Sequence, residues 1–174
     1  MNEKIESPQG FGHYEWKQEF HKYYENLEIN SFLINVMSEL KKLGWPEEED
    51  PVDYDDFKSI LVKSSNKRIR LIAISNRLSS YRDDLKKIYE NIVFFLKSDP
   101  MTKGKIKEEK KKYAELDLYD EILILNRIDK VLKRILDLAE SYKIKYDSTS
   151  RVLSIVEYER KQASQELIQG ELKR

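Results

Sequence analysis

The sequence has no cysteine, only 5 glycines and 4 prolines, and no long apolar run. Without cysteine, disulfide scaffolds, thiolate zinc sites, iron–sulfur clusters and cysteine nucleophiles are excluded. The longest apolar run, residues 92–96, is much shorter than the roughly 18 residues of a membrane-spanning helix. The first ten residues lack the apolar core of a secretion signal. We therefore expect a soluble, cytoplasmic protein with no membrane segment.

The sequence also lacks the short motifs of common catalysts. It has no glycine-rich phosphate loop, no GxGxxG, no GxSxG and no HExxH. Its two histidines, His13 and His21, lie eight residues apart without the spacing of a metal site. The acidic residues between 47 and 56 lack the central glycine and closing glutamate of a calcium loop, which favours a solvated linker. We expect no catalytic residue, no metal site and no cofactor.

Charge is abundant but is distributed unevenly along the chain. Residues 1–56 carry 5 Lys and no Arg against 14 acids, a net charge of −9. Residues 57–112 carry 16 Lys and Arg against 6 acids, a net charge of +10, and residues 113–174 carry 11 against 12, a net charge of −1. This separation predicts that the middle segment attracts a polyanion and that the first segment repels one.

The first segment has helical periodicity from about residue 13 to residue 43. Two apolar stripes follow spacings of four and three, with a break or kink expected near Asn30. Lys41 and Lys42, followed by Gly44 and Pro46, are typical of a helix end. The aromatic residues here are interpreted as a core or protein interface, since base stacking is disfavoured in an acidic segment. The stripes are Trp16, Phe20, Tyr23 and Leu27, then Leu33, Val36, Leu40 and Leu43.

The clearest pattern lies in the basic segment. Apolar residues follow strict heptad spacing, which predicts a helix suited to coiled-coil or bundle packing. The helix should begin near Asp55 and Asp56 and end by Ser98, because Pro100 disfavours helical geometry before it. The heptad residues are Leu71, Ile74, Leu78, Tyr81, Leu85, Ile88, Ile92 and Phe95.

Helical periodicity resumes after the SDPMTKGK segment, over about residues 105–146. Its wide apolar face predicts two helical neighbours, and the DSTS at 147–150 predicts either a kink or the cap of a new helix. The predicted fold is an all-α, elongated helical bundle built on a long antiparallel helical hairpin with coiled-coil-like packing. We expect an acidic aromatic region (1–44), a proline-containing acidic linker (45–56), and the hairpin with a C-terminal helix (57–174).

Two basic zones are the candidate nucleic-acid-binding residues. Clustered Lys and Arg bind phosphates by charge and release counterions, which gives salt-sensitive affinity without sequence preference. The alternative is a solvated or protein-binding helix surface. In a closed hairpin the two zones would lie at opposite ends. They comprise Lys63, Lys67, Arg68 and Arg70 in the first zone, and Lys103, Lys105, Lys107, Lys110, Lys111 and Lys112 in the second.

The C-terminal half resembles a known family. KVLKRI at 130–135 and SRVLSIVEYERKQAS at 150–164 look like the end of phage recombination mediators of the UvsY type. In the second stretch Ile155, Val156, Glu157, Tyr158 and Arg160 stand in the order of that family's amphipathic helix, with Tyr158 in place of the usual Trp. The resemblance covers about residues 115–165. It implies a helical oligomer that binds single-stranded DNA and loads a recombinase.

We thus expect a non-enzymatic homo-oligomer that acts in nucleic-acid handling, with single-stranded DNA as a partner. Residues 1–56 would then either cover the basic segment or dock a basic protein surface. The alternative is a structural or adaptor protein, such as a virion or scaffold component, with no nucleic-acid contact. In that case the opposite charges would drive pairing between subunits.

Overall fold

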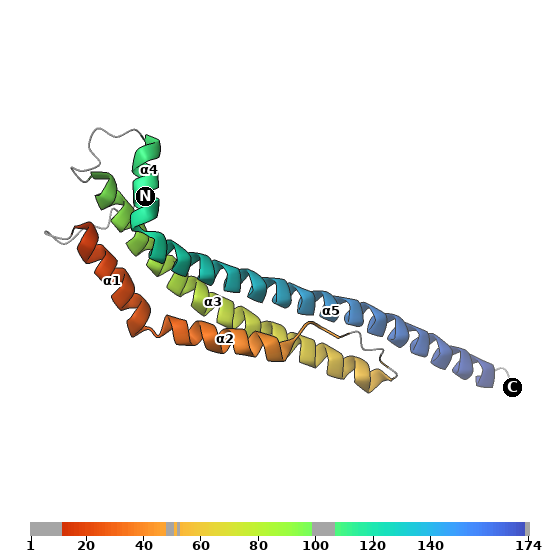
Figure 1. Ribbon diagram of the computed structural model, residues 1–174. Coiled ribbons are helices and arrows are strands. Elements are labelled where there is room, and N and C mark those ends of the chain that lie inside the picture. Colours follow the sequence, from red (N-terminus) through yellow and green to blue (C-terminus); the bar gives the residue numbers. More distant parts are fainter. Residues whose placement is uncertain (1–11, 48–50, 52, 99–106, 173–174) are drawn as a thin grey trace. The chain divides into compact units, whose positions relative to one another are not determined.

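The computed structural model of the chain describes residues 12–47, 51, 53–98 and 107–172, and these form helices without a strand (Figure 1). The helices are α1 (His13–Asn26), α2 (Ile29–Leu43), α3 (Tyr54–Ser98), α4 (Lys107–Asp117) and α5 (Tyr119–Leu172). The predicted all-α class is confirmed, and no helix in these ranges has a stretch long and apolar enough to cross a membrane. Residues 1–11 and most of the SDPMTKGK segment lie outside the described residues.

Local sequence signals explain where α1 and α3 begin. The side chain of Asp53 accepts a hydrogen bond from the Asp56 main-chain N–H at 2.9 Å, and acidic residues occupy the first turn of α3. This is the preferred arrangement at a helix N-terminus. At the start of α1, the Gly12 N–H donates to Glu15 Oε2 at 2.9 Å. The predicted start of α3 near Asp55 and its end at Ser98 are confirmed.

The helix breaks differ from the predictions. The first break lies at Leu27 and Glu28 rather than at Asn30, because Glu28 adopts a left-handed backbone (φ 48°) and the buried Ile29 already belongs to α2. A second break, not predicted, separates α4 from α5 at Leu118. The DSTS segment neither ends nor starts a helix, since α5 runs through it. There the Ser148 hydroxyl donates to the Lys145 carbonyl at 2.9 Å, a bond within a helix rather than a cap.

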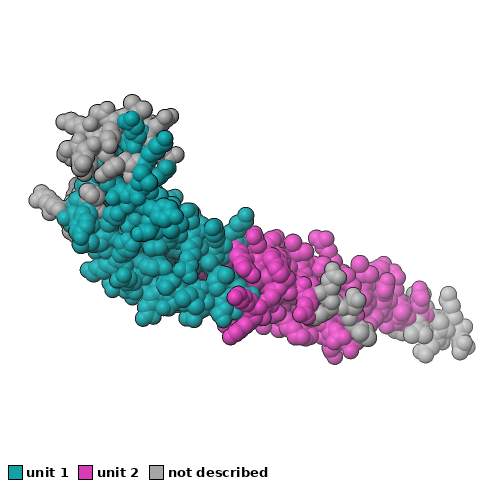
Figure 2. Space-filling model, viewed as in Figure 1, with its two compact units in different colours: residues 1–40, 75–133 teal, residues 41–74, 134–174 magenta. Residues whose placement is uncertain are grey.

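The chain divides into two compact units, each built from separate stretches of sequence (Figure 2). Unit 1 comprises residues 1–40 and 75–133, and unit 2 comprises residues 41–74 and 134–174. Both α3 and α5 therefore contribute to both units. The units are defined by contacts in space, whereas the ranges expected from the sequence were defined by composition. The region expected at 1–44 is accordingly divided between the two units at residue 40.

The core of unit 1 is formed by α1 and α2 together with parts of α3 and α5. Leu78, Leu85 and Ile92 of the heptad series are fully buried, while Tyr81 and Ile88 are half-buried. The heptad pattern thus predicts the innermost stripe of α3. The other fully buried apolar side chains among the described residues of this unit are Phe20, Ile29, Leu33, Leu96, Leu118 and Ile128.

The core of unit 2 is smaller and includes polar groups. Leu71 and Ile135 are fully buried, and the aromatic ring of Tyr142 is 3% exposed. Ser64 and Thr149 are also buried, at 4% and 8% exposure. Beyond Thr149, no side chain between residues 150 and 166 is buried. The burial of α5 therefore decreases toward its C-terminal end.

Candidate functional site

The first basic zone lies on α3 within unit 2. Lys67 and Arg68 are half-buried, whereas Lys63 and Arg70 are exposed. Residues 57–82 contain seven Lys and Arg and not one Asp or Glu. This part of α3 therefore presents a local excess of positive charge, which attracts anions.

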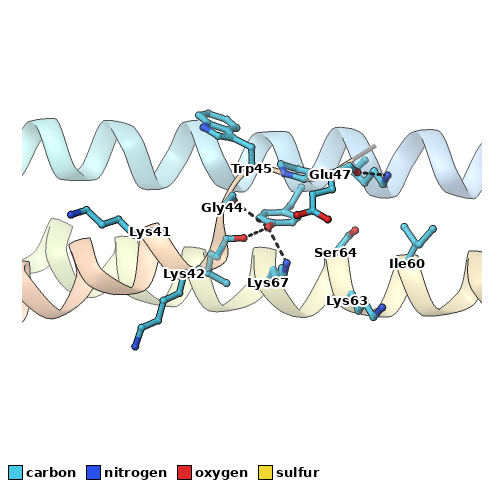
Figure 3. A pocket seen from close by; sticks show the side chains of 13 residues that line it. Lys41, Lys42, Gly44, Trp45, Glu47, Ile60, Lys63, Ser64 and Lys67 are labelled. Atoms are coloured by element: carbon cyan, nitrogen blue, oxygen red, sulfur yellow. Dashed lines mark hydrogen bonds between the residues drawn. The ribbon is translucent and has the colours of Figure 1, made fainter. Parts of the chain in front are cut away.

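A pocket of about 370 Å³ opens beside this zone (Figure 3). It is formed by the end of α2 with the residues that follow it, by one face of α3, and by α5. Its charged lining comprises five lysines and one glutamate, so the net charge of the lining is +4. The lysines are Lys41, Lys42, Lys63, Lys67 and Lys145, the glutamate is Glu47, and the other lining residues are Leu43, Gly44, Trp45, Pro46, Ile60, Ser64 and Tyr142.

The end of α2 and the residues directly after it form one side of the pocket. Lys41 and Lys42 occupy the last turn of α2, where a positive charge opposes the negative end of the helix dipole. Gly44 then takes a left-handed conformation (φ 61°), which ends the helix and turns the chain. Trp45 follows directly, and its side chain remains 58% exposed. A large, exposed aromatic side chain therefore belongs to the lining of the lysine-rich pocket.

Tyr142 joins the three elements at the inner wall of the pocket. Its hydroxyl donates to the Leu43 carbonyl at 2.9 Å, with the Gly44 carbonyl at 3.2 Å, and accepts a hydrogen bond from Lys67 Nζ at 3.1 Å. The Lys67 ammonium also lies 5.1 Å from the centre of the tyrosine ring. Lys145 also donates a hydrogen bond to the Glu47 carbonyl at 2.7 Å. Hydrogen bonds to main-chain carbonyls thus fix Tyr142 and Lys145 at the inner wall of the pocket.

The remaining lysines are oriented differently. In Figure 3 the ammonium groups of Lys41, Lys42 and Lys63 point away from that of Lys67 and from one another. None of the three forms an ion pair with a described carboxylate. Since a lysine side chain has a flexible four-carbon stem, these groups can turn toward an anion. They form a rim around the fixed inner donor, Lys67.

The second basic zone belongs to unit 1, so the two zones are parts of different compact units. Lys110 is half-buried and Lys112 is exposed, both on α4. Lys103 and Lys105 lie outside the described residues, as do the side chains of Lys107 and Lys111. The structure therefore brings only Lys63 and Lys67, of the ten residues predicted from sequence, to a common pocket.

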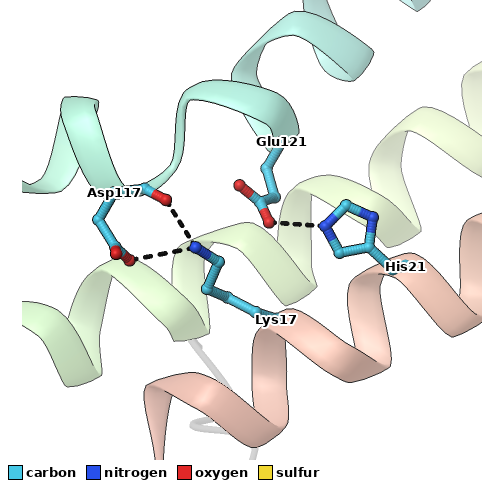
Figure 4. A network of polar contacts seen from close by, with 4 residues as sticks. All are labelled: Lys17, His21, Asp117 and Glu121. Atoms are coloured by element: carbon cyan, nitrogen blue, oxygen red, sulfur yellow. Dashed lines mark hydrogen bonds and ion pairs between the residues drawn. The ribbon is translucent and has the colours of Figure 1, made fainter.

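Unit 1 contains a second set of buried polar contacts, between α1 and the junction of α4 with α5 (Figure 4). Lys17 Nζ donates to the Asp117 carbonyl at 2.6 Å and lies 3.3 Å from its carboxylate. His21 Nε2 lies 2.9 Å from Glu121 Oε1. A pocket of about 550 Å³ beside them has a mixed lining that includes Lys22 and Glu25. No group of three potential metal ligands occurs among the described residues. This arrangement attaches α1 and shows no excess of charge for a ligand.

Sequence reasoning missed most of the unit 2 pocket. Lys41 and Lys42 were interpreted only as signals of a helix end, and Tyr142 only as a core position. Trp45 was assigned to a linker, and Lys145 was not singled out. Residues 1–56 have a net negative charge, so their lysines were not considered as candidate site residues. Two of these five lysines, Lys41 and Lys42, line the pocket. An adjacent Lys-Lys-Leu-Gly-Trp stretch was the available signal.

Comparison with protein-family models, with curated proteins and with solved structures finds no match for this chain. The resemblance to phage recombination mediators therefore stays a prediction that depends on the residues alone.

Proposed function

We propose that the protein is a non-enzymatic, self-associating helical protein that binds single-stranded nucleic acid through the lysine-rich surface of unit 2. The observation that carries this proposal is the grouping of five lysines, with one carboxylate side chain, around a pocket next to an exposed tryptophan. Lysines supply phosphate affinity through counterion release, and an aromatic face supplies base stacking that tolerates any sequence. We place this activity in the cytoplasm, in an assembly that handles single-stranded DNA.

A long antiparallel pairing of α3 and α5 with coiled-coil-like packing is part of the proposal. Within unit 2, Tyr54 donates to Glu157 at 2.6 Å and Lys67 donates to Tyr142 at 3.1 Å, so residue numbers fall on α5 as they rise on α3. Within unit 1, Arg82 of α3 donates to Asp129 of α5 at 2.8 Å. The two pairs of unit 2 support the antiparallel direction there, and the unit 1 pair supports contact between α3 and α5.

Exposed apolar residues on α5 support self-association. Ile144, Ile155 and Tyr158 are 61%, 58% and 61% exposed. Their separations of 11 and 14 residues place them on one face of a helix. This face lies opposite the side that carries Tyr142. A second copy of the chain would bury it, as helical bundles bury wide apolar faces.

The test is fluorescence anisotropy of a labelled oligothymidine, titrated with the protein at several salt concentrations. The triple variant Lys41→Glu, Lys42→Glu and Lys63→Glu should bind about tenfold or more weakly, and its salt slope should fall by about 2, or about 0.7 per lost phosphate contact. The matched control is Lys86→Glu, Lys130→Glu and Lys133→Glu, three exposed lysines of unit 1. Equal weakening of both variants, or no binding at about 50 mM salt, would contradict the proposal.

The second candidate function is a structural or adaptor protein without nucleic-acid contact, favoured by the exposed face of Ile144, Ile155 and Tyr158. Light scattering tests the association itself. Ile155→Glu should reduce the oligomer mass, whereas Ser164→Glu, at an exposed position about half a turn around the helix from this face, should not. An oligomer that fails to bind the oligonucleotide would favour this second function. If the protein stays a monomer at high concentration, self-association is contradicted for both candidate functions.

A further inference from the structure

The unit 2 pocket has the size of a small-molecule site rather than that of a long groove. Its volume of about 370 Å³ lies near the lower end of the range of about 300–1,000 Å³ for ligand pockets. A nucleic-acid strand contacting the lysine-rich surface would therefore place only a short part of itself inside. The occupant of the pocket can be deduced from the groups that line it.

The inner wall presents a fixed cationic donor. The single hydrogen of the Tyr142 hydroxyl is directed at the Leu43 and Gly44 carbonyls, so the hydroxyl oxygen accepts from Lys67. An ammonium group has three N–H bonds, and this contact uses one, which leaves two for an anion. Because Tyr142 is 3% exposed and held by main-chain groups, the position of Lys67 Nζ is set before a ligand arrives.

The rim can complete a phosphate site around this donor. Lys63 lies one helical turn before Lys67 on α3, and Lys145 lies three residues after Tyr142 on α5. One carboxylate side chain, that of Glu47, competes with an anion in the lining. Phosphate oxygens attract lysine ammonium groups as point charges, without the planar geometry that arginine requires. The lining contains no arginine.

The lining also includes an apolar surface on which a base can stack. Trp45 belongs to the lining and is 58% exposed, and Pro46 follows it there. A phosphate alone would leave this aromatic surface unused. An unpaired nucleobase would cover it, and stacking on an aromatic side chain contributes about 1–3 kcal/mol per base.

We infer that the unit 2 pocket binds one nucleotide unit, with its phosphate held by Lys67, Lys63 and Lys145 and its unpaired base stacked on Trp45. This inference rests on the proposed function and specifies what the site recognises. A base paired in a duplex cannot stack on Trp45, so the pocket selects single strands. The nucleotide unit can come from a strand or from a free mononucleotide.

Tryptophan fluorescence provides the test. The chain has two tryptophans, so in the full-length Trp16→Phe variant the signal comes from Trp45 alone. The variant is titrated with deoxyadenosine monophosphate, with deoxyadenosine and with inorganic phosphate. The mononucleotide should quench Trp45, and each of the other two probes should bind about tenfold or more weakly, since each lacks one half of the contacts. Quenching as strong with deoxyadenosine as with the mononucleotide would overturn the phosphate site.

Substitutions assign the binding to the pocket. Lys67→Met should weaken mononucleotide binding about tenfold or more, whereas Lys161→Met, at an exposed position of α5, should leave it unchanged. Circular dichroism confirms that each variant folds. If Lys67→Met reduces helicity, Lys63→Met replaces it, because Lys63 is exposed and has no hydrogen bond to Tyr142. Unchanged mononucleotide affinity in a folded variant would overturn the inference.

The two proposals fail in distinguishable ways. If the oligonucleotide binds but the mononucleotide does not quench Trp45, the proposed function stands and the nucleotide pocket is overturned. If the mononucleotide binds and the oligonucleotide does not, the pocket stands with a free nucleotide as its ligand, and the proposed function is overturned. A duplex that binds as tightly as the single strand at equal salt would overturn the stacking of an unpaired base on Trp45.

Discussion

His21 Nε2 lies 2.9 Å from Glu121 Oε1, and Glu121 is 1% exposed although it carries a carboxylate. The second carboxylate oxygen, Oε2, is also buried and has no hydrogen-bond partner among the described residues. A buried polar group with incomplete hydrogen bonding opposes folding. His21 therefore supplies a hydrogen bond that helps to hold this carboxylate in the core of unit 1.

His21→Ala should reduce the free energy of unfolding by about 1–3 kcal/mol, because it leaves the Glu121 carboxylate buried without a partner. The double variant His21→Ala with Glu121→Leu should regain most of this loss, since an apolar side chain of similar size replaces the unpaired charge. Urea unfolding of both variants measures the difference. A double variant no more stable than His21→Ala would show that the pair does not carry the effect.

Tyr23 gives unit 1 a pH dependence at alkaline pH. Burial, together with the hydrogen bond that its hydroxyl donates to Asp84 at 2.7 Å, raises the pKa of Tyr23 to about 12. In the unfolded chain the pKa of a tyrosine is about 10. The pKa of Tyr23 is higher in the folded state than in the unfolded chain, so the protonated side chain stabilises the fold. This stabilisation is fully present below about pH 10 and is lost as the pH rises toward 12.

Tyr23→Phe should therefore weaken the fall in stability between about pH 10 and 12 relative to the parent chain. It should also cost about 1 kcal/mol at neutral pH through the lost hydrogen bond. Thermal unfolding at a series of pH values measures both effects. Tyr14→Phe is the control, because Tyr14 is 63% exposed and should change neutral-pH stability little. Parallel pH profiles for the parent and Tyr23→Phe would refute this assignment.

Gly44 provides a test of backbone strain at the end of α2. Its φ of 61° is left-handed, and a Cβ built there would meet no atom within 4 Å. Any decrease in the free energy of unfolding in Gly44→Ala therefore arises from backbone conformation and not from a clash. We expect a decrease of about 1–2 kcal/mol for Gly44→Ala and a smaller decrease for Gly44→Asn, because asparagine tolerates this conformation better. Equal losses by urea unfolding for the two variants would argue against strain.

Tyr142→Phe should destabilise unit 2 by about 1–2 kcal/mol, because the Leu43 and Gly44 carbonyls lose their donor and Lys67 loses its acceptor. Tyr146→Phe is the matched control on the same helix, since Tyr146 is 39% exposed. Chemical unfolding followed by circular dichroism compares the two. An identical midpoint for both variants would show that the hydroxyl of Tyr142 contributes nothing to stability.

The sequence predicted α3 well because its signals are local. Asp53 to Asp56 lie at the N-terminus, and the heptad residues Leu71, Leu78, Leu85 and Ile92 occupy every seventh position and are all fully buried. The DSTS segment was ambiguous, because a serine hydroxyl can cap a helix or bond to a carbonyl within it. The break at Glu28 was placed two residues late because glutamate rarely adopts a left-handed backbone, so its residue type gave no signal of a break there.

The candidate site was only partly predictable. Lys63 and Lys67 were identified from charge density alone. The contribution of Lys41, Lys42 and Lys145 depends on packing α2 and α5 beside α3, and residues about 100 positions apart in sequence leave no periodic signal of such packing. Tyr142 follows the apolar spacing of α5, so its ring was predicted to be in the core while the role of its hydroxyl stayed hidden.

Neither compact unit is a continuous stretch of chain, and this has a consequence for folding. The polar contacts that join the first and last thirds link residues 97 to 103 positions apart, as in Lys17–Asp117, Arg127–Asn30 and Tyr54–Glu157. Contacts this distant in sequence raise the contact order, so folding should be slower than in a helical chain whose contacts are all local. A fragment that holds all of unit 1 also carries residues 41–74 of unit 2, so neither unit can be cut free by itself. A ribosome must release residue 133 before unit 1 can close, and most of residues 134–174 as well before unit 2 can close.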